Sequence, residues 1–180
     1  ILESYCRVNM IEDYSRLGPR DREICLPFQR KRVLGHIDHL LDAETDNWSL
    51  GAAYLDLAGI YAADRDCPQA IPYYLKGLAC LPDHQMALSN LAACYERLRE
   101  YDNAVEILQR LASIQTGSAA LMTRLAANYL KLDNHGEAIK YIEKALRCDN
   151  RYVPTLVAAG MIYGTKGDFT RAVSYSQKAL

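Results

Sequence analysis

The histidines are the residues of this sequence whose type and spacing come closest to a metal site. His36 and His39 flank Asp38 at a spacing that puts two imidazoles on one face of a helix, where they could ligate zinc. A zinc site also needs a third ligand and an activating carboxylate, and the spacing of the residues around these histidines does not supply them well. We therefore interpret these two as solvated surface histidines, and expect His84 and His135 in turns between helices.

The cysteines show no spacing that indicates a functional site. They form no C-x-x-C pair and no pattern of metal ligands. They are Cys6, Cys25, Cys67, Cys80, Cys94 and Cys148. We interpret them as small buried thiols in a reducing compartment, which predicts a cytoplasmic protein with no metal and no redox cofactor.

Composition argues against several function classes. The net charge is -1, with 21 Lys and Arg against 22 Asp and Glu, so no basic surface for nucleic acid is expected. No apolar run approaches the roughly 18 residues of a membrane-spanning helix, and residues 1–16 lack the apolar core of a signal peptide. The sequence contains neither a Gly-rich phosphate loop nor G-x-S-x-G. We therefore predict a protein that is not an enzyme and has neither nucleic acid nor membrane as a partner.

The sequence from Gly51 onward repeats every 34 residues, and we call each 34-residue repeat a row. The helices that would position any functional site follow this repeat. The eleventh and twentieth positions of the rows hold Tyr61, Tyr95, Tyr129 and Tyr163, and Ala70, Ala104, Ala138 and Ala172. Apolar residues within each row recur at intervals of three and four, interrupted by a short polar break. Each row is thus predicted to form two antiparallel helices, with the tyrosines in the core and with Asp102 and Asp168 as caps of second helices.

The pattern resembles the tetratricopeptide repeat family, whose rows read W-x2-L-G-x2-Y, then A-x3-F, A and P. Row one supplies Tyr54, Leu57, Ala58, Tyr61, Ala70, Tyr74, Gly77 and Pro82. The resemblance covers residues 51–180 and implies an all-α superhelical solenoid of helix hairpins. It places four repeats at 51–84, 85–118, 119–152 and 153–180, the last one incomplete or uncapped.

The two ends depart from the repeat. Residues 1–50 are predicted to form a helical N-terminal cap, with helices over 1–16 and about 29–44 and a turn region at 15–23. The second of these helices could instead be part of a degenerate repeat. Because Leu180 lies inside a second helix, we expect either a fragment of a longer protein or an end that packs against another molecule, such as a second copy or further repeats.

In the family, the first helices of the rows line a concave groove, which implies a partner-binding surface in this chain. The candidate residues are Asp56, Gly59, Met86, Asn90, Ala93, Arg97, Thr123, Arg124, Ala127, Lys131 and Met161. Small and apolar side chains dominate this face, which leaves room for an extended peptide or a helix. Asn90 could hydrogen-bond a peptide backbone, and Arg124 and Lys131 could meet a carboxylate.

The favoured function is a scaffold or adaptor that binds a peptide or helix of a partner protein within a larger assembly. The alternative is a regulatory or substrate-recruiting region of a larger enzyme whose catalytic domain lies outside this chain. A carboxylate-clamp co-chaperone is less favoured. Asn90 and Arg124 match that clamp, but Leu55, Gly59 and Ala120 replace its other polar and cationic residues.

Overall fold

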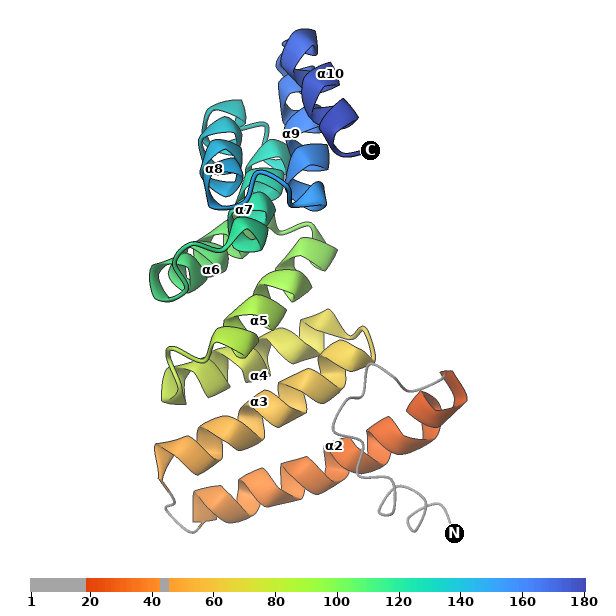
Figure 1. Cartoon of the computed structure of the whole chain (residues 1–180). Helices are drawn as coiled ribbons and strands as arrows, with labels where there is room; N and C mark the ends of the chain where they lie inside the picture. Colours follow the sequence, from red (N-terminus) through yellow and green to blue (C-terminus); the bar gives the residue numbers. More distant parts are fainter. Residues whose placement is uncertain (1–18, 43–45) are drawn as a thin grey trace. The chain divides into compact units, whose positions relative to one another are not determined.

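The computed structural model describes residues 19–42 and 46–180, and these residues form helices and no strand. The helices are α2 (Pro19–Asp42), α3 (Asn47–Ala63), α4 (Cys67–Cys80), α5 (Gln85–Leu98), α6 (Tyr101–Ile114), α7 (Ala119–Lys131), α8 (His135–Cys148), α9 (Val153–Thr165) and α10 (Phe169–Lys178) (Figure 1). The chain divides into two compact units, Ile1–Cys94 (unit 1) and Tyr95–Leu180 (unit 2). Each unit is described by itself.

The N-terminal region differs from the prediction. The helix predicted over 1–16 lies outside the described residues, and the turn predicted at 15–23 is wrong for residues 19–23, which belong to α2. Proline is tolerated in the first turn of a helix because its missing N–H would have no partner there, so Pro19 can begin α2. The helix also continues through Pro27, a position that costs a backbone hydrogen bond.

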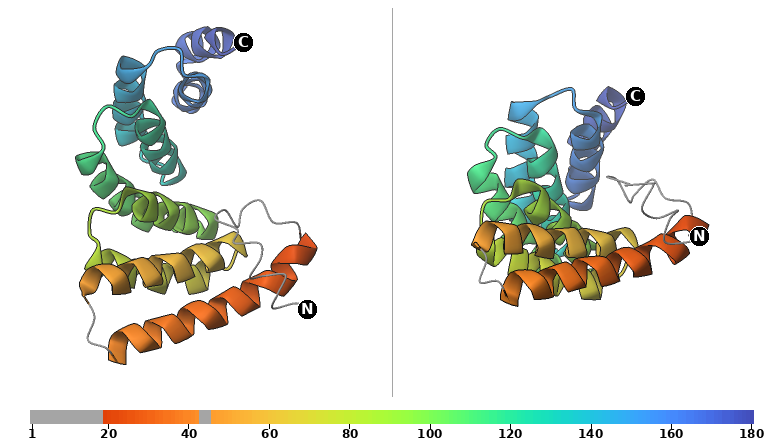
Figure 2. Two further views of the ribbon diagram at one scale, coloured as in Figure 1. Left: turned by 60° about the horizontal axis from the view of Figure 1, so that its bottom comes forward. Right: turned by 90° about the horizontal axis from the view of Figure 1, so that it is seen from below.

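Packing against α3 compensates for that cost. Ile37 and Leu40 of α2 form a buried cluster with Ala53 and Leu57 of α3, and Leu26 packs with Ile60 nearby. The two helices run side by side in Figures 1 and 2. The apolar face of α2 thereby covers one side of α3.

The turns repeat as regularly as the helices. The residue that ends each turn between the two helices of a row adopts a left-handed conformation, at Arg65, Arg99, Asp133 and Gly167, with φ of 63°, 62°, 58° and 84°. Glycine adopts this conformation without steric cost, whereas arginine and aspartate do not. The turn therefore has one fixed geometry, imposed by the packing of the helices it joins, even where the local residue disfavours it.

The fixed turn also decides which residues cap the second helices. Asp66, Asn134 and Asp168 accept backbone hydrogen bonds from the residue three positions later, at 3.3, 3.1 and 3.1 Å. The prediction for Asp168 is confirmed. The prediction for Asp102 is wrong, because the cap position of α6 falls on Glu100, which makes no such side-chain bond.

Two glycines allow α3 and α4 to approach closely. A Cβ atom at Gly51 would lie 2.7 Å from the Cβ atom of Cys80, and one at Gly77 would lie 2.4 Å from a methyl carbon of Leu55. Both distances are too short for real carbon contacts, so the spacing of α3 and α4 depends on these glycines.

The core of unit 2 lies among α7, α8, α9 and α10. Its buried members are Ala126, Ala138, Ile142, Ala158, Ala159, Ile162 and Tyr163. The small residues at the repeated positions let the helices pass closely, and partly buried tyrosines complete the cluster.

The tyrosine column lies in the core only in part. Tyr163 is buried, whereas Tyr61, Tyr95 and Tyr129 are half-buried. Tyr61, Tyr129 and Tyr163 each stack on a second tyrosine, at ring-centroid distances of 5.5, 5.4 and 5.6 Å. Stacking explains the half-buried positions, because a tyrosine pair can shield its faces while each hydroxyl stays near solvent.

Candidate functional site

The predicted partner-binding residues belong to both units. Unit 1 holds Asp56, Gly59, Met86, Asn90 and Ala93, and unit 2 holds Arg97, Thr123, Arg124, Ala127, Lys131 and Met161. The structure therefore defines two separate candidate surfaces, which we describe in turn.

A groove of about 380 Å³ lies in unit 1 along α3 and α5, and we call it the α3–α5 groove. Its lining residues are Trp48, Ala52, Leu55, Asp56, Gly59, Tyr74, Leu81, His84, Met86, Ala87 and Asn90. It brings together four of the five predicted residues of this unit. Ala93 is half-buried on α5 and is not among the lining residues.

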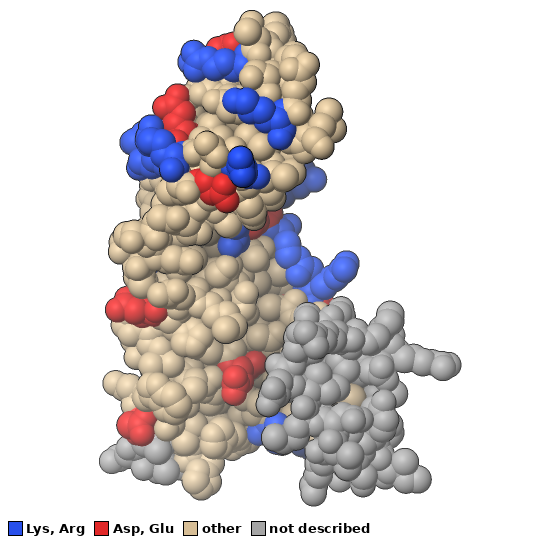
Figure 3. Space-filling view, viewed as in Figure 1, with Lys and Arg blue, Asp and Glu red and all other residues tan. Residues whose placement is uncertain are grey.

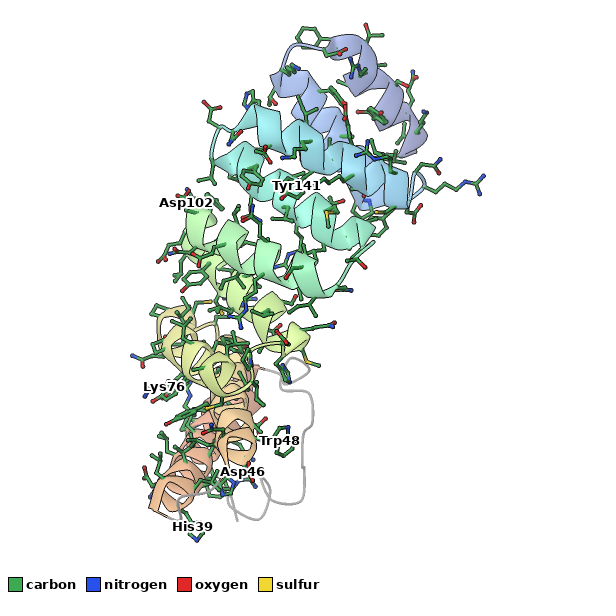
Figure 4. The ribbon with its side chains drawn as sticks, turned by 90° about the vertical axis from the view of Figure 1, so that its left-hand side faces the viewer. His39, Asp46, Trp48, Lys76, Asp102 and Tyr141 are labelled. Atoms are coloured by element: carbon green, nitrogen blue, oxygen red, sulfur yellow. The ribbon has the colours of Figure 1, made fainter. Side chains whose placement is uncertain are left out.

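One end of the groove is flanked by two exposed apolar side chains. Trp48 is 68% exposed and Met86 is 70% exposed. Figure 4 shows the Trp48 ring projecting from the start of α3, beside Asp46. The side chain of Asp46 accepts a hydrogen bond of 2.7 Å from the backbone N–H of Ser49 and so fixes this end of α3.

Tyr74 of α4 forms the floor of the groove. The side chain is 2% exposed, and its hydroxyl is buried beside the Asn90 side chain without a hydrogen bond of good geometry to it. Burial raises the pKa of Tyr74 to about 12, although the neighbouring Asn90 side chain acts in the opposite direction. A neutral hydroxyl thus lies beneath the groove next to the Asn90 amide.

Asp56 contributes the carboxylate of the groove, whose lining contains no lysine or arginine. The side chain is exposed, yet the surrounding apolar walls desolvate it and raise the pKa of Asp56 above its ordinary value. The charges of His36 and Arg32 on α2 act in the opposite direction and lower this pKa. None of the ion pairs within the described residues involves Asp56.

The candidate surface of unit 2 is a shallower hollow of about 340 Å³. It is lined by Glu96, Tyr101, Arg124, Ala127, Asn128 and Lys131. Arg124 donates to both carboxylate oxygens of Glu96, at 3.3 and 3.0 Å, and Asn128 donates to Glu96 at 2.8 Å. Arg124 is therefore already engaged with a carboxylate of its own chain, and Lys131 is the exposed cation of the hollow.

The prediction that Thr123 faces a groove is wrong. Its side chain is buried and shares a hydrogen bond of 2.6 Å with the Thr155 hydroxyl, while it also donates to the Ala119 carbonyl at 2.8 Å. The position of Thr123 in the repeat predicts a side chain on the open face of its helix. In the structure the contact between α7 and α9 covers that side chain. Arg97 and Met161 are exposed and lie outside the lining of this hollow.

Two further findings concern sites of other kinds. Within residues 19–42 and 46–180, no group of three or more His, Cys, Asp and Glu side chains is placed to hold a metal ion. None of the helices described for this chain is both long and apolar enough to cross a membrane.

Two family profiles, both described as tetratricopeptide repeat, match this chain at residues 83–151 and 153–180. The chain belongs to the tetratricopeptide repeat family. Among curated proteins, tetratricopeptide repeat protein 29 of Trypanosoma brucei brucei is 27% identical over 146 residues, which are 68% of this chain and 30% of that protein. Tetratricopeptide repeat protein 14 of Mus musculus is 36% identical over 67 residues, or 37% of this chain and 9% of that protein. The chain thus spans less than a third of the length of either relative.

Solved tetratricopeptide structures share the fold. A crystal structure of MamA matches with a TM-score of 0.71 and 22% identity, covering 88% of this chain and 86% of that one. MamA from Desulfovibrio magneticus RS-1 gives 0.71 at 19% identity, with 94% of each chain covered. YrrB, described as a protein of this family with an unusual peptide-binding site, gives 0.61 at 17% identity, with 71% and 66% covered. The all-α tetratricopeptide fold predicted from the sequence is confirmed.

Trp48 and Tyr74 are among the groove residues of this tetratricopeptide protein that were not predicted from the sequence. Trp48 precedes the first row, and Tyr74 occupies a core position of the family pattern. One sequence feature singled out Trp48, which is the single tryptophan of the chain. No sequence pattern indicated that Tyr74 would border the groove.

The buried threonine pair leads to a first prediction. Replacing Thr123 with valine keeps the shape of the side chain but leaves the fully buried Thr155 hydroxyl unpaired. We expect the free energy of unfolding to fall by about 1–3 kcal/mol, and the Thr123→Val/Thr155→Val double variant to recover most of that loss. Urea denaturation of both variants measures this. If Thr123→Val left stability unchanged, the hydroxyl pair would not be a buried contact.

Proposed function

We propose that this chain is a protein-interaction scaffold or adaptor that binds a peptide or helix of a partner protein, in the α3–α5 groove first of all. The observation that carries the proposal is the combination of exposed apolar walls with the exposed polar side chains of Asp56 and Asn90 in one groove. Apolar walls with a few placed polar groups are typical of ligand sites. On the face seen in Figure 3, the surface over α3 to α5 carries few charged atoms, which also suits a protein partner.

The same proposal includes the cellular compartment and the further contact surfaces of the chain. The cysteines of the described residues are Cys25, Cys67, Cys80, Cys94 and Cys148, all of them free thiols, which supports a reducing cytoplasmic setting. The hollow of unit 2 with Lys131 is a second candidate contact surface. The exposed apolar residues of α10, Phe169 and Val173, offer a surface for a second copy or for further repeats.

Selection of random peptides displayed on phage against the whole chain tests the proposal. We expect enriched peptides to lose at least tenfold in affinity for Met86→Glu, because the charge lies at the groove wall. Leu75→Glu is the matched control, since Leu75 is also an exposed apolar residue of unit 1 but does not line the groove. If the enriched peptides bind Met86→Glu as tightly as the wild type, the groove is not the binding surface.

A further inference from the structure

The α3–α5 groove has two chemically distinct ends along α3. Trp48, Ala52, Leu55, Asp56 and Gly59 recur on one face of this helix and line the groove. Trp48 lies at the apolar end, where Met86 of α5 also contributes. Asp56 lies eight residues further along, or about 12 Å at the rise of an α-helix.

The apolar end can accept a large side chain. Trp48 and Met86 together leave much of their apolar surface in contact with water, and a ligand side chain placed between them would remove that surface from solvent. A carboxylate that apolar walls desolvate gains most from a partner with the opposite charge. The groove lining supplies no such partner to Asp56, and Arg32 and His36 form no ion pair with it.

The groove stays open at Gly59, three residues beyond Asp56 along α3. A Cβ atom added at Gly59 would meet no atom within 4 Å, so a peptide backbone can lie close to α3 at this point. The exposed Asn90 side chain lines the same groove and can hydrogen-bond to that backbone.

We propose that the α3–α5 groove selects an extended peptide with a large apolar side chain about three or four residues from a lysine or arginine, since an extended chain advances about 3.3–3.6 Å per residue. The apolar side chain binds between Trp48 and Met86, and the cation pairs with Asp56. This inference rests on the proposed function and names the class of partner for the same groove.

The fluorescence of Trp48 reports on this groove directly, because the chain contains one tryptophan. The probes are the synthetic peptides GSGFSGKSGS and GSGFSGESGS, together with GSGKSGFSGS for the opposite chain direction. We expect one of the two lysine peptides to shift the Trp48 emission and to bind at least tenfold more tightly than the glutamate peptide. In Asp56→Lys this ranking is expected to reverse.

Two glycine variants give a matched control for blocking the groove. Gly59→Gln and Gly35→Gln both replace a helix glycine whose added Cβ would meet no atom within 4 Å, and Gly35 lies on the exposed face of α2. Both changes are expected to raise the melting temperature, because glutamine favours a helix more than glycine does. Only Gly59→Gln is expected to weaken the lysine peptide, by at least tenfold.

The inference is overturned if lysine and glutamate peptides bind equally, if Asp56→Lys leaves the ranking unchanged, or if no peptide alters Trp48 fluorescence up to millimolar concentration. These results are distinct from a failure of the proposed function. Displayed peptides that lack lysine and arginine but still lose binding to Met86→Glu would leave the groove as the binding surface and remove only its preference for a cation.

Discussion

Replacing Tyr163 with alanine is expected to lower the free energy of unfolding by about 3–5 kcal/mol, the range for large aromatic residues deleted from a core. Tyr163 is 2% exposed and belongs to the buried cluster of unit 2. Its ring stacks on Tyr175 at 5.6 Å, and its hydroxyl donates to Glu143 at 3.1 Å. Truncation removes the apolar contacts and leaves a cavity beside α8 and α10.

Tyr163→Phe separates the ring from the hydroxyl. This variant keeps the packed ring and loses the bond to Glu143, so we expect a loss of only about 1 kcal/mol. Chemical denaturation followed by circular dichroism, with hydrogen exchange to localise the effect to unit 2, measures both variants. Equal losses for alanine and phenylalanine would contradict a packing role for the ring.

Replacing Leu57 with alanine is expected to lower the free energy of unfolding by about 2–5 kcal/mol. Leu57 of α3 is fully buried and packs in one cluster with Ile37 and Leu40 of α2. The cavity would therefore weaken the docking of α2 as well as the core of unit 1. Unfolding followed by Trp48 fluorescence reports on this unit.

Leu75→Ala is the matched control for this change. Leu75 lies on α4 of the same unit and is exposed, so the same truncation removes little buried surface and is expected to cost below about 1 kcal/mol. If the two leucine variants were equally stable, α2 and α3 would not pack through the buried cluster described above.

The sequence predicted several residues that line the α3–α5 groove, but it misplaced Thr123 and missed the partner of Arg124. Both differences have one physical reason. The repeat register identifies the helix face that looks away from the hairpin partner, and Asp56, Gly59, Met86 and Asn90 do line one groove. The register says nothing of contacts between helices of different rows. Such contacts bury Thr123 and engage Arg124 with Glu96, which is 28 residues away along the chain.

The N-terminal region illustrates the same limit. Local rules predict that a helix avoids Pro27, and they place the turn at 15–23. In the structure α2 begins at Pro19 and passes through Pro27, because burial of Leu26, Ile37 and Leu40 against α3 outweighs the lost backbone bond.

The sequence by itself determined the family, the all-α fold and the approximate position of the helix hairpins. These features depend on the spacing of apolar residues and on capping, which act within one or two helical turns or recur identically in each row. The tertiary structure alone decided that Trp48 is exposed, that Tyr74 borders the groove and that Asp56 lies in an apolar groove. Each of these depends on how closely separate helices approach one another, and that distance is fixed by side chains far apart in the sequence, such as Gly77 and Leu55.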